Sequence, residues 1–324
     1  MFSKNKNRIP QIQSKQPKNN KYYFSKLTKH LKNQESRQIH MVEQLTKVRF
    51  TNLNKIIFPQ KKIQKSQVIE YYIRIAPKIL NILLNRAIVL NRFPNGINKK
   101  GFYEKNAPKG TPAWVKKAKI YSKTTNQDTN YILCNDLDTL IWLANLTAIE
   151  LHIPLSTIND REKPDFIFFD IDPEPPASIK EATIVSLLIK EKLDQIGLKS
   201  YIKTSGKKGL HIMVPIKPTS SFKQTKKFVH EIGLQLTKEN SLVVSELSDT
   251  KKPGKIFVDY LQNSLGRTIA SPYSLRATPK ALVSTPLEWT EIKKGIKPSE
   301  FNINSIIKRD KEPWKDILKN KQEF

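Results

Sequence analysis

The chain has 324 residues, of which 38% are apolar, and it carries 57 Lys and Arg against 29 Asp and Glu. The formal net charge of +28 favours a polyanionic partner, and the single cysteine excludes a disulfide framework and a cysteine-based zinc cluster. No apolar run has transmembrane length and no basic amphipathic helix with a bulky apolar face stands out, so nucleic acid is favoured over a membrane.

The N-terminal residues 1–44 differ in composition from the rest of the chain. Their first 40 positions hold ten Lys or Arg, a single acid, Glu35, and little apolar periodicity. We predict a basic, disordered arm that contacts phosphates nonspecifically, followed by one folded domain over residues 45–324. The arm lacks the apolar segment of a signal peptide, and its excess of Lys over Arg argues against a mitochondrial leader. We therefore expect a reducing, cytoplasmic location.

Helical and strand-like segments mix through the folded part. Apolar periodicity predicts helices over residues 65–83, 138–151, 177–197 and 221–240. Ser66 is the expected N-cap of the first helix, the second runs toward His152, and Gly197 closes the third. Apolar runs predict strands over residues 86–93, 164–172, 200–204, 210–216 and 255–262. Short strand–loop–strand connections indicate an α+β fold with mixed or antiparallel sheets flanked by helices.

Two aspartates, Asp170 and Asp172, end the strand "FIFFDIDP". Alternate residues of a strand face the same way, so the two carboxylates share one face. Neighbouring carboxylates repel one another unless cations neutralise them, and hard divalent metals prefer oxygen ligands. Asp259 ends another apolar strand and offers a third carboxylate. Taken alone, a D-x-D pair more often marks solvated acids at the end of a strand.

The segment "SGKKGLHIMVP" adds a cationic glycine loop. Gly206 and Gly209 allow a close approach of the backbone to a ligand, as in phosphate-binding loops. Ser205 offers a hydroxyl, Lys208 offers charge, and His211 opens the next strand. The alternative is a hairpin turn with an incidental histidine.

The combination of these motifs is more informative than any one of them. Gln262, Asn263, Arg267 and Arg276 follow Asp259. Three carboxylates at two strand ends, beside a cationic loop, are the side chains that two-metal phosphoryl transfer requires.

The chain resembles the polymerase module of bacterial DNA ligase D, in the archaeo-eukaryotic primase superfamily. The resemblance runs from about Val48 to about Trp314 and includes "RFPNGINKKGFYEKNAP", "FDIDP", "SGKKGLHIMVP", "VDYLQNSLGRT", "PYSLRATP" and "VSTPLEW". It implies a primase–polymerase core in which Asp170, Asp172 and Asp259 hold two Mn²⁺ or Mg²⁺ ions. It also implies contacts to a nucleoside triphosphate by Ser205, Lys208, His211, His152, Gln262 and Arg276.

The same resemblance implies contacts to DNA. Phe102 and Tyr103 match aromatic residues that stack on the template base. Asn52, Lys55 and Lys65 match residues that hold the 5′-phosphate on the far side of a gap, although in so basic a chain they are otherwise typical of solvated lysines. Asn91 departs from the family, because a lysine is expected there, and the neighbouring Arg92 is a candidate to compensate.

The resemblance implies a template-dependent nucleotidyltransferase that fills gaps and extends ends in non-homologous end joining. It implies a preference for ribonucleotides and manganese, and a nucleoid-associated protein in a prokaryotic cytoplasm. The expected partners are gapped or broken DNA with a 5′-phosphate, and possible protein partners are a separate DNA ligase and Ku. Two alternatives stay open: a non-catalytic DNA-end-binding module, and a metal-dependent phosphoesterase that uses the same acids on water.

Overall fold

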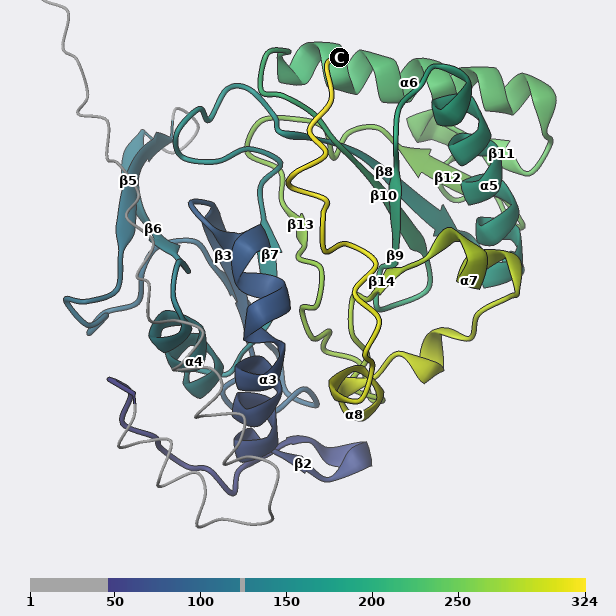
Figure 1. Cartoon of the computed structure of the whole chain (residues 1–324). Helices are drawn as coiled ribbons and strands as arrows, with labels where there is room; N and C mark the ends of the chain where they lie inside the picture. The colour runs from purple at the N-terminus through teal and green to yellow at the C-terminus, as the bar shows by residue number, and fades with distance from the viewer. Residues whose placement is uncertain (1–45, 123–125) are drawn as a thin grey trace, which may run out of the picture.

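The computed structural model describes residues 46–122 and 126–324, so the predicted basic arm over residues 1–44 lies outside the described residues. The described residues form two six-stranded sheets and a short hairpin, with helices packed against them (Figure 1). In this part of the chain, no helix is both long and apolar enough to cross a membrane.

The first sheet has the order β13-β7-β3-β6-β5, and β4 pairs with β3 outside this path. Its pairings are antiparallel. The strands are β3 (Ala87–Arg92), β4 (Phe102–Glu104), β5 (Lys117–Ser122), β6 (Gln127–Leu133), β7 (Ala148–Ile153) and β13 (Ile269–Ala270). The short hairpin of β1 (Ile56–Phe58) and β2 (Ile63–Gln64), joined by η1 (Pro59–Lys61), precedes it in the chain.

The second sheet has the order β11-β12-β8-β10-β9-β14 and is antiparallel except for the parallel pair β11–β12. Its strands are β8 (Phe166–Pro173), β9 (Tyr201–Thr204), β10 (Leu210–Pro215), β11 (Val243–Val244), β12 (Ile256–Asp259) and β14 (Pro286–Leu287). The α+β class with antiparallel sheets is therefore confirmed.

Two long helices, α5 (Ile179–Gln195) and α6 (Phe222–Glu239), cover one face of the second sheet (Figure 1). Phe169 of β8 packs against Phe228 of α6, with ring centroids 6.4 Å apart. Since side chains alternate along β8, its aspartates at positions 170 and 172 face away from these helices. That opposite face looks toward the first sheet, and this arrangement positions the site.

The helix α3 (Lys65–Leu83) lies between the part of the molecule built on the first sheet and the C-terminal segment. It packs against α4 (Leu137–Asn145) and α8 (Ile303–Ile307). Its Tyr72 hydroxyl donates to the Ile149 carbonyl of β7 at 2.7 Å, and its Tyr71 hydroxyl donates to the Tyr273 carbonyl at 2.7 Å. These bonds satisfy two fully buried hydroxyls and hold the helix against β7 and against the segment around Tyr273.

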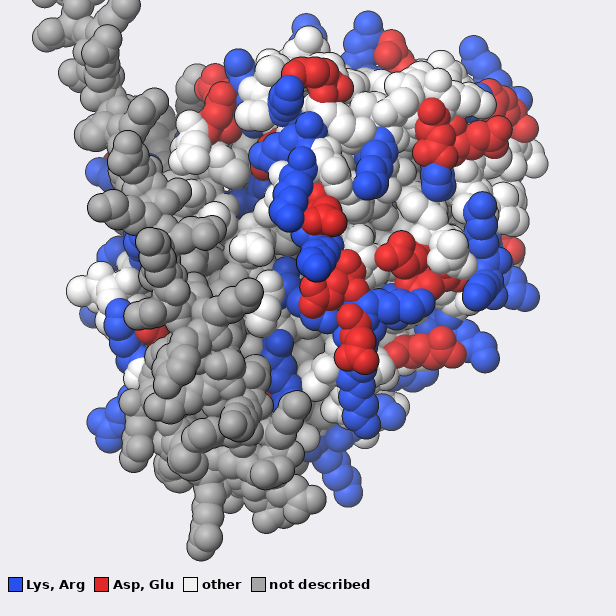
Figure 2. Space-filling view, viewed as in Figure 1, with Lys and Arg blue, Asp and Glu red and all other residues white. Residues whose placement is uncertain are grey.

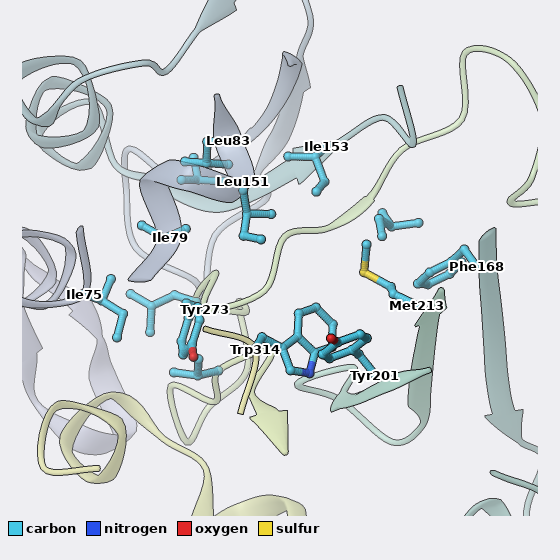
Figure 3. Packing of buried hydrophobic residues seen from close by; sticks show 14 of the residues in the cluster. Ile75, Ile79, Leu83, Leu151, Ile153, Phe168, Tyr201, Met213, Tyr273 and Trp314 are labelled. Atoms are coloured by element: carbon cyan, nitrogen blue, oxygen red, sulfur yellow. The ribbon is translucent and has the colours of Figure 1, made fainter. Parts of the chain in front are cut away.

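The C-terminal segment packs back onto the second sheet. It contains α7 (Trp289–Lys293), η3 (Pro298–Glu300) and α8, while η2 (Leu247–Asp249) precedes β12. In Figure 3 the indole of Trp314 lies against the ring of Tyr201, and the indole donates to the Ile202 carbonyl at 3.1 Å. Figure 3 also shows Ile75, Ile79 and Leu83 of α3 in the same apolar cluster. This cluster includes buried residues of both sheets.

Two local predictions were wrong. The N-cap of α3 is Gln64, whose side chain forms a reciprocal capping box with Gln67, and Ser66 lies inside the helix. The second predicted helix ends at Asn145, because Thr147 adopts a left-handed backbone and Ala148–Ile153 form β7. His152 is therefore a strand residue. Alternating burial cannot reveal this strand, since all six of its residues are buried.

Candidate active site

A cleft of about 290 Å³ lies between the two sheets. One side is formed by β7 and β13 and the other by β8, β10 and the loop between β9 and β10. Eight of the nine residues expected to bind metal and nucleotide line this cleft: Asp170, Asp172, His211, His152, Arg276, Lys208, Ser205 and Gln262. The ninth, Asp259, is placed beside them by strand pairing. The structure thus brings together residues more than 100 positions apart.

The three aspartates meet on adjacent strands. Asp259 of β12 is the register partner of Asp170 of β8, and Asp172 lies two residues further along the same face. Burial raises the pKa of Asp170 to about 6. Burial, followed by the nearby Asp170 charge, raises the pKa of Asp172 to about 6, and burial raises that of Asp259. Three crowded carboxylates resist ionisation when no cation is near, and a bound divalent cation would supply the charge that keeps them ionised.

The carboxylates do not yet converge on one point. Among the described residues, no group of three or more His, Cys, Asp or Glu side chains is arranged closely enough to hold a metal ion. Asp259 accepts hydrogen bonds from the Leu261 amide at 2.7 Å and from Gln262 at 3.3 Å. The carboxylate oxygens are therefore suitable ligands for divalent cations. In this structure, however, Asp259 is held by Leu261 and Gln262, and Asp170 lies beside His211.

His211 lies beside the acidic row. It is the register partner of Asp170 on one side and of Lys203 on the other. Its Nε2 lies 3.2 Å from Asp170 Oδ1, and its Nδ1 lies 2.6 Å from the Lys203 Nζ. Burial, followed by the charges of Lys203 and Arg276, holds the pKa of His211 well below its usual value, so the ring is neutral.

The glycine loop is packed against the site. A side chain on Gly209 would lie 2.4 Å from the Ile171 carbonyl oxygen, and Gly206, at φ +72°, lies against Arg276. The Ser205 Oγ accepts the loop amides of Lys207 and Gly209, both at 3.1 Å. The glycines therefore allow the loop to pack closely onto β8 and Arg276. This is a role in addition to the close approach of a ligand that we predicted from sequence. Lys208 is exposed and lies 3.8 Å from Glu174.

A buried carboxylate, Glu150, holds the nucleotide-side residues in place. Its Oε2 lies 3.0 Å from His152 Nε2 and accepts from the Asn91 amide at 3.1 Å. Its Oε1 accepts from Arg276 Nε at 3.2 Å and from the Ala277 amide at 3.0 Å. Burial opposes ionisation of Glu150, but these donors and the Arg276 charge together lower its pKa well below the usual range. Glu150 is thus an ionised anchor for His152 and Arg276.

Asn91 stands where the family resemblance led us to expect a lysine, and its surroundings show whether the neighbouring Arg92 can replace that lysine. Asn91 is buried and bonds Glu150. Arg92 cannot take the place of the expected lysine, because adjacent strand residues face opposite ways. Its guanidinium instead pairs with Glu104 at 2.7 Å and lies over the Phe102 ring at 5.4 Å.

The two aromatics of β4 also face opposite ways. Tyr103 lies near His152, with ring centroids 5.5 Å apart, while Phe102 packs with Arg92. Both rings are exposed, Phe102 by 44% and Tyr103 by 62%. Tyr103 therefore lies beside His152, which lines the cleft, and Phe102 presents a separate exposed ring.

The two lysines expected to bind a terminal phosphate lie next to each other. The Lys65 amide donates to the Lys55 carbonyl at 2.8 Å, at the first turn of α3. The Lys65 Nζ donates to the Thr51 carbonyl at 2.6 Å, and the Lys55 Nζ donates to Asn95 at 3.1 Å. Burial, followed by the Lys55 charge, lowers the pKa of Lys65 to about 8. Asn52 is exposed at the turn that precedes them, with φ +50°.

The model of the LigD primase-polymerase domain family matches residues 64–317. The chain belongs to this family. It is 34% identical over 86% of its length to a "Bifunctional non-homologous end joining protein LigD" of Bacillus subtilis, and 29% identical over 78% to a "Multifunctional non-homologous end joining protein LigD" of Mycolicibacterium smegmatis. It spans 45% and 33% of those two proteins, less than half of either.

A solved structure supports the same assignment. The polymerase domain of Mycobacterium tuberculosis ligase D, in complex with DNA, superposes with a TM-score of 0.78 at 25% identity. The match covers 86% of this chain and all of that one. The predicted family and primase–polymerase fold are confirmed.

Two residues of the site escaped the sequence prediction. Lys203 lies in the predicted strand over residues 200–204 and received no role from sequence, yet a hairpin that pairs Thr204 with Leu210 must also pair Lys203 with His211. Glu150 was missed because its segment was assigned to a helix. On a strand, Glu150 and His152 share a face, and that spacing would have revealed the pair.

Proposed function

We propose that the chain carries out template-dependent nucleotidyl transfer at the cleft between the two sheets. The primer 3′-hydroxyl attacks the α-phosphorus of a nucleoside triphosphate, the bond to the next phosphate oxygen breaks, and pyrophosphate leaves. The observation that carries the proposal is the row of Asp259, Asp170 and His211 on neighbouring strands, facing Arg276 and His152 across one cleft.

Each side chain of the cleft has a chemical role in this reaction. Asp170, Asp172 and Asp259 would hold two Mn²⁺ or Mg²⁺ ions, which when bound supply charge for the triphosphate and for the attacking oxygen. Arg276 and Lys208 provide fixed and mobile positive charge for the phosphates, and Ser205 and Gln262 border the same space. His152, held by Glu150, borders the cleft beside Tyr103, where base and sugar would lie.

DNA is the proposed partner. Phe102 and Tyr103 are exposed aromatic rings suited to stacking on template bases, and base stacking on an aromatic ring contributes roughly 1–3 kcal/mol per base. Lys55 and Lys65 lie next to each other at the first turn of α3, close to Asn52, and we assign them to the 5′-phosphate of a gap. Lys65 is buried and bonded to Thr51, so Lys55 is the more accessible of the two charges. Figure 2 shows Lys and Arg interspersed with Asp and Glu on the visible face.

The biological setting follows from the family. We propose gap filling and end extension in non-homologous end joining, with a separate ligase and Ku as protein partners, in a nucleoid-associated setting. A preference for ribonucleotides and manganese is part of the proposal.

Extension of a labelled primer on gapped DNA, with Mn²⁺, Mg²⁺ or EDTA, tests the proposed function. Metal-dependent growth of the primer supports it. Tight DNA binding without growth would favour a non-catalytic end-binding module. Release of phosphate or nucleotides with no primer growth would favour a phosphoesterase.

A further inference from the structure

One ionisable group beside the cleft has no role in the reaction described above. Lys203 of β9 is fully buried, so it cannot contact nucleotide or DNA. Its Nζ lies 2.6 Å from His211 Nδ1 and 2.6 Å from Ser284 Oγ. Lysines are almost never fully buried unless they are paired, so its two partners indicate what it does.

The hydrogen bonds around Lys203 have a defined direction. The Ser284 hydroxyl donates to the Thr204 carbonyl at 3.1 Å, so its oxygen accepts from Lys203. On the other side, the Lys203 Nζ lies 2.6 Å from His211 Nδ1, and a lysine ammonium group has three donors and no acceptor. His211 Nδ1 must then accept from Lys203, and the single N–H of a neutral imidazole lies on Nε2, 3.2 Å from Asp170 Oδ1.

We propose that Lys203 is a positioning residue that fixes His211 as the Nε2–H tautomer and holds its ring plane. The inference rests on the proposed function, because the cleft-facing nitrogen is then a donor in a space suited to a triphosphate. The other tautomer would direct a lone pair at Asp170 and at any bound phosphate, and two negative groups facing a lone pair repel it. Lys203 therefore keeps the cleft-facing nitrogen of His211 a donor without entering the cleft.

The tautomer can be measured without any nucleotide or DNA. The chain has five histidines, and nitrogen NMR of a ¹⁵N-histidine-labelled sample distinguishes protonated from unprotonated ring nitrogens. The signals of His211 are assigned as those that disappear in His211→Ala. In the wild type we expect a protonated Nε2 and an unprotonated Nδ1. In Lys203→Met, which keeps a similar length and removes the donor, we expect the Nδ1 signal to shift toward the protonated form.

A kinetic experiment separates positioning from packing. Removing the hydrogen-bond partner that orients a ligand-binding histidine typically lowers activity roughly 10- to 100-fold. We expect Lys203→Met to lower the rate of nucleotide incorporation in this range. The same change in a His211→Ala background should have little further effect, because Lys203 acts through His211. Lys203→Met leaves the buried acceptors of His211 and Ser284 without their donor, so a modest fall in the thermal midpoint is expected, and the comparison in the His211→Ala background separates this loss of stability from the effect on the rate.

A second variant keeps the test decisive if Lys203→Met fails to fold. Ser284→Ala removes one acceptor of Lys203 and should move the His211 signals in the same direction by a smaller amount. An Nδ1–H tautomer in the wild type, unchanged His211 signals in both variants, or an equal loss of rate in the His211→Ala background would overturn the inference. An inactive wild-type enzyme would instead count against the proposed function and leave the NMR result standing.

Discussion

Asp170 and Asp259 are register partners on the antiparallel strands β8 and β12, so two carboxylates separated by 88 intervening residues face each other across one backbone pairing. Side chains directly opposite in such a pair have Cβ atoms about 4.5–5.5 Å apart. Like charges at that distance destabilise the sheet, and a fold retains them at a cost that bound cations would offset. Bound cations would therefore stabilise this pair, and the first two experiments test its carboxylates.

The first prediction concerns the acidic row. Asp170→Asn, Asp172→Asn and Asp259→Asn should each reduce primer extension to near background, because each removes a proposed metal ligand. DNA affinity should stay nearly unchanged, since Lys and Arg contacts to phosphate supply most of it. Asp316→Asn is the matched control, because Asp316 is an exposed aspartate paired with Lys319. Extension close to wild type by one of the three variants would remove that residue from the metal site.

The second prediction concerns pH and stability. Burial raises the pKa of Asp170 and of Asp172 to about 6, above the usual value near 4, so the fold favours their protonated forms. The metal-free protein should therefore gain stability, on the order of 1–2 kcal/mol per carboxyl, as the pH falls from 7 toward 4.5.

The measurement is the thermal midpoint against pH, in EDTA, for the wild type and for Asp170→Asn/Asp172→Asn. The difference between the two proteins isolates these carboxyls from all other titrating groups. Mn²⁺ should raise the wild-type midpoint at pH 7.5 and lose this effect below pH 6, where protons compete for the same oxygens. Parallel pH curves for the two proteins would contradict the predicted coupling.

The third prediction concerns the triphosphate. Lys208 is 54% exposed in its side chain and lies on the loop that borders the cleft. Lys208→Ala should raise the KM for the nucleotide by roughly tenfold, with a smaller change in kcat, because it removes one charged partner of a polyanion. Lys217→Ala, a similarly exposed lysine paired with Glu323, should change neither constant. An unchanged KM in Lys208→Ala would place the triphosphate elsewhere.

The fourth prediction concerns the 5′-phosphate. The double change Lys55→Ala/Lys65→Ala should abolish the preference for 5′-phosphorylated gaps, and it should leave extension of an open primer–template nearly unchanged. The pKa of Lys65 is lowered to about 8, and only its ammonium form would attract the phosphate. The wild-type preference should therefore decline as the pH rises from 7 through 8, and the sign is opposite to that of a carboxylate site.

Binding to gapped DNA with and without the 5′-phosphate, at one salt concentration, measures this preference. Lys61→Ala/Lys62→Ala, two exposed lysines in the same hairpin, is the matched control. A wild type with no preference, or a double variant that keeps it, would show that the phosphate is bound elsewhere.

Sequence reasoning reached most of the site because its key residues end apolar strands in recognisable motifs. The strand that ends in Asp170 and Asp172, and the hairpin before His211, were predicted from local pattern alone. Only the family resemblance predicted that these motifs lie in one site with His152 and Arg276, because local pattern does not determine which distant strands pair.

What stayed unpredicted depends on burial that local pattern cannot reveal. β7 is buried along its whole length. The sequence of such a short, fully buried segment does not distinguish a helix from a strand. Glu150 and Lys203 are charges fully enclosed by other elements, and composition treats them as solvated ions. Their roles follow from partners on distant segments, Arg276 for one and Ser284 for the other.

The central claim is that this cleft joins nucleotides to DNA under the direction of a template. The most direct measurement is single-nucleotide addition to a primer across a 5′-phosphorylated gap with Mn²⁺, in which the template base is changed through all four identities. We predict that the nucleotide added changes with the template base, and that Asp170→Asn adds none. Addition that ignores the template base, or equal addition by Asp170→Asn, would contradict the claim.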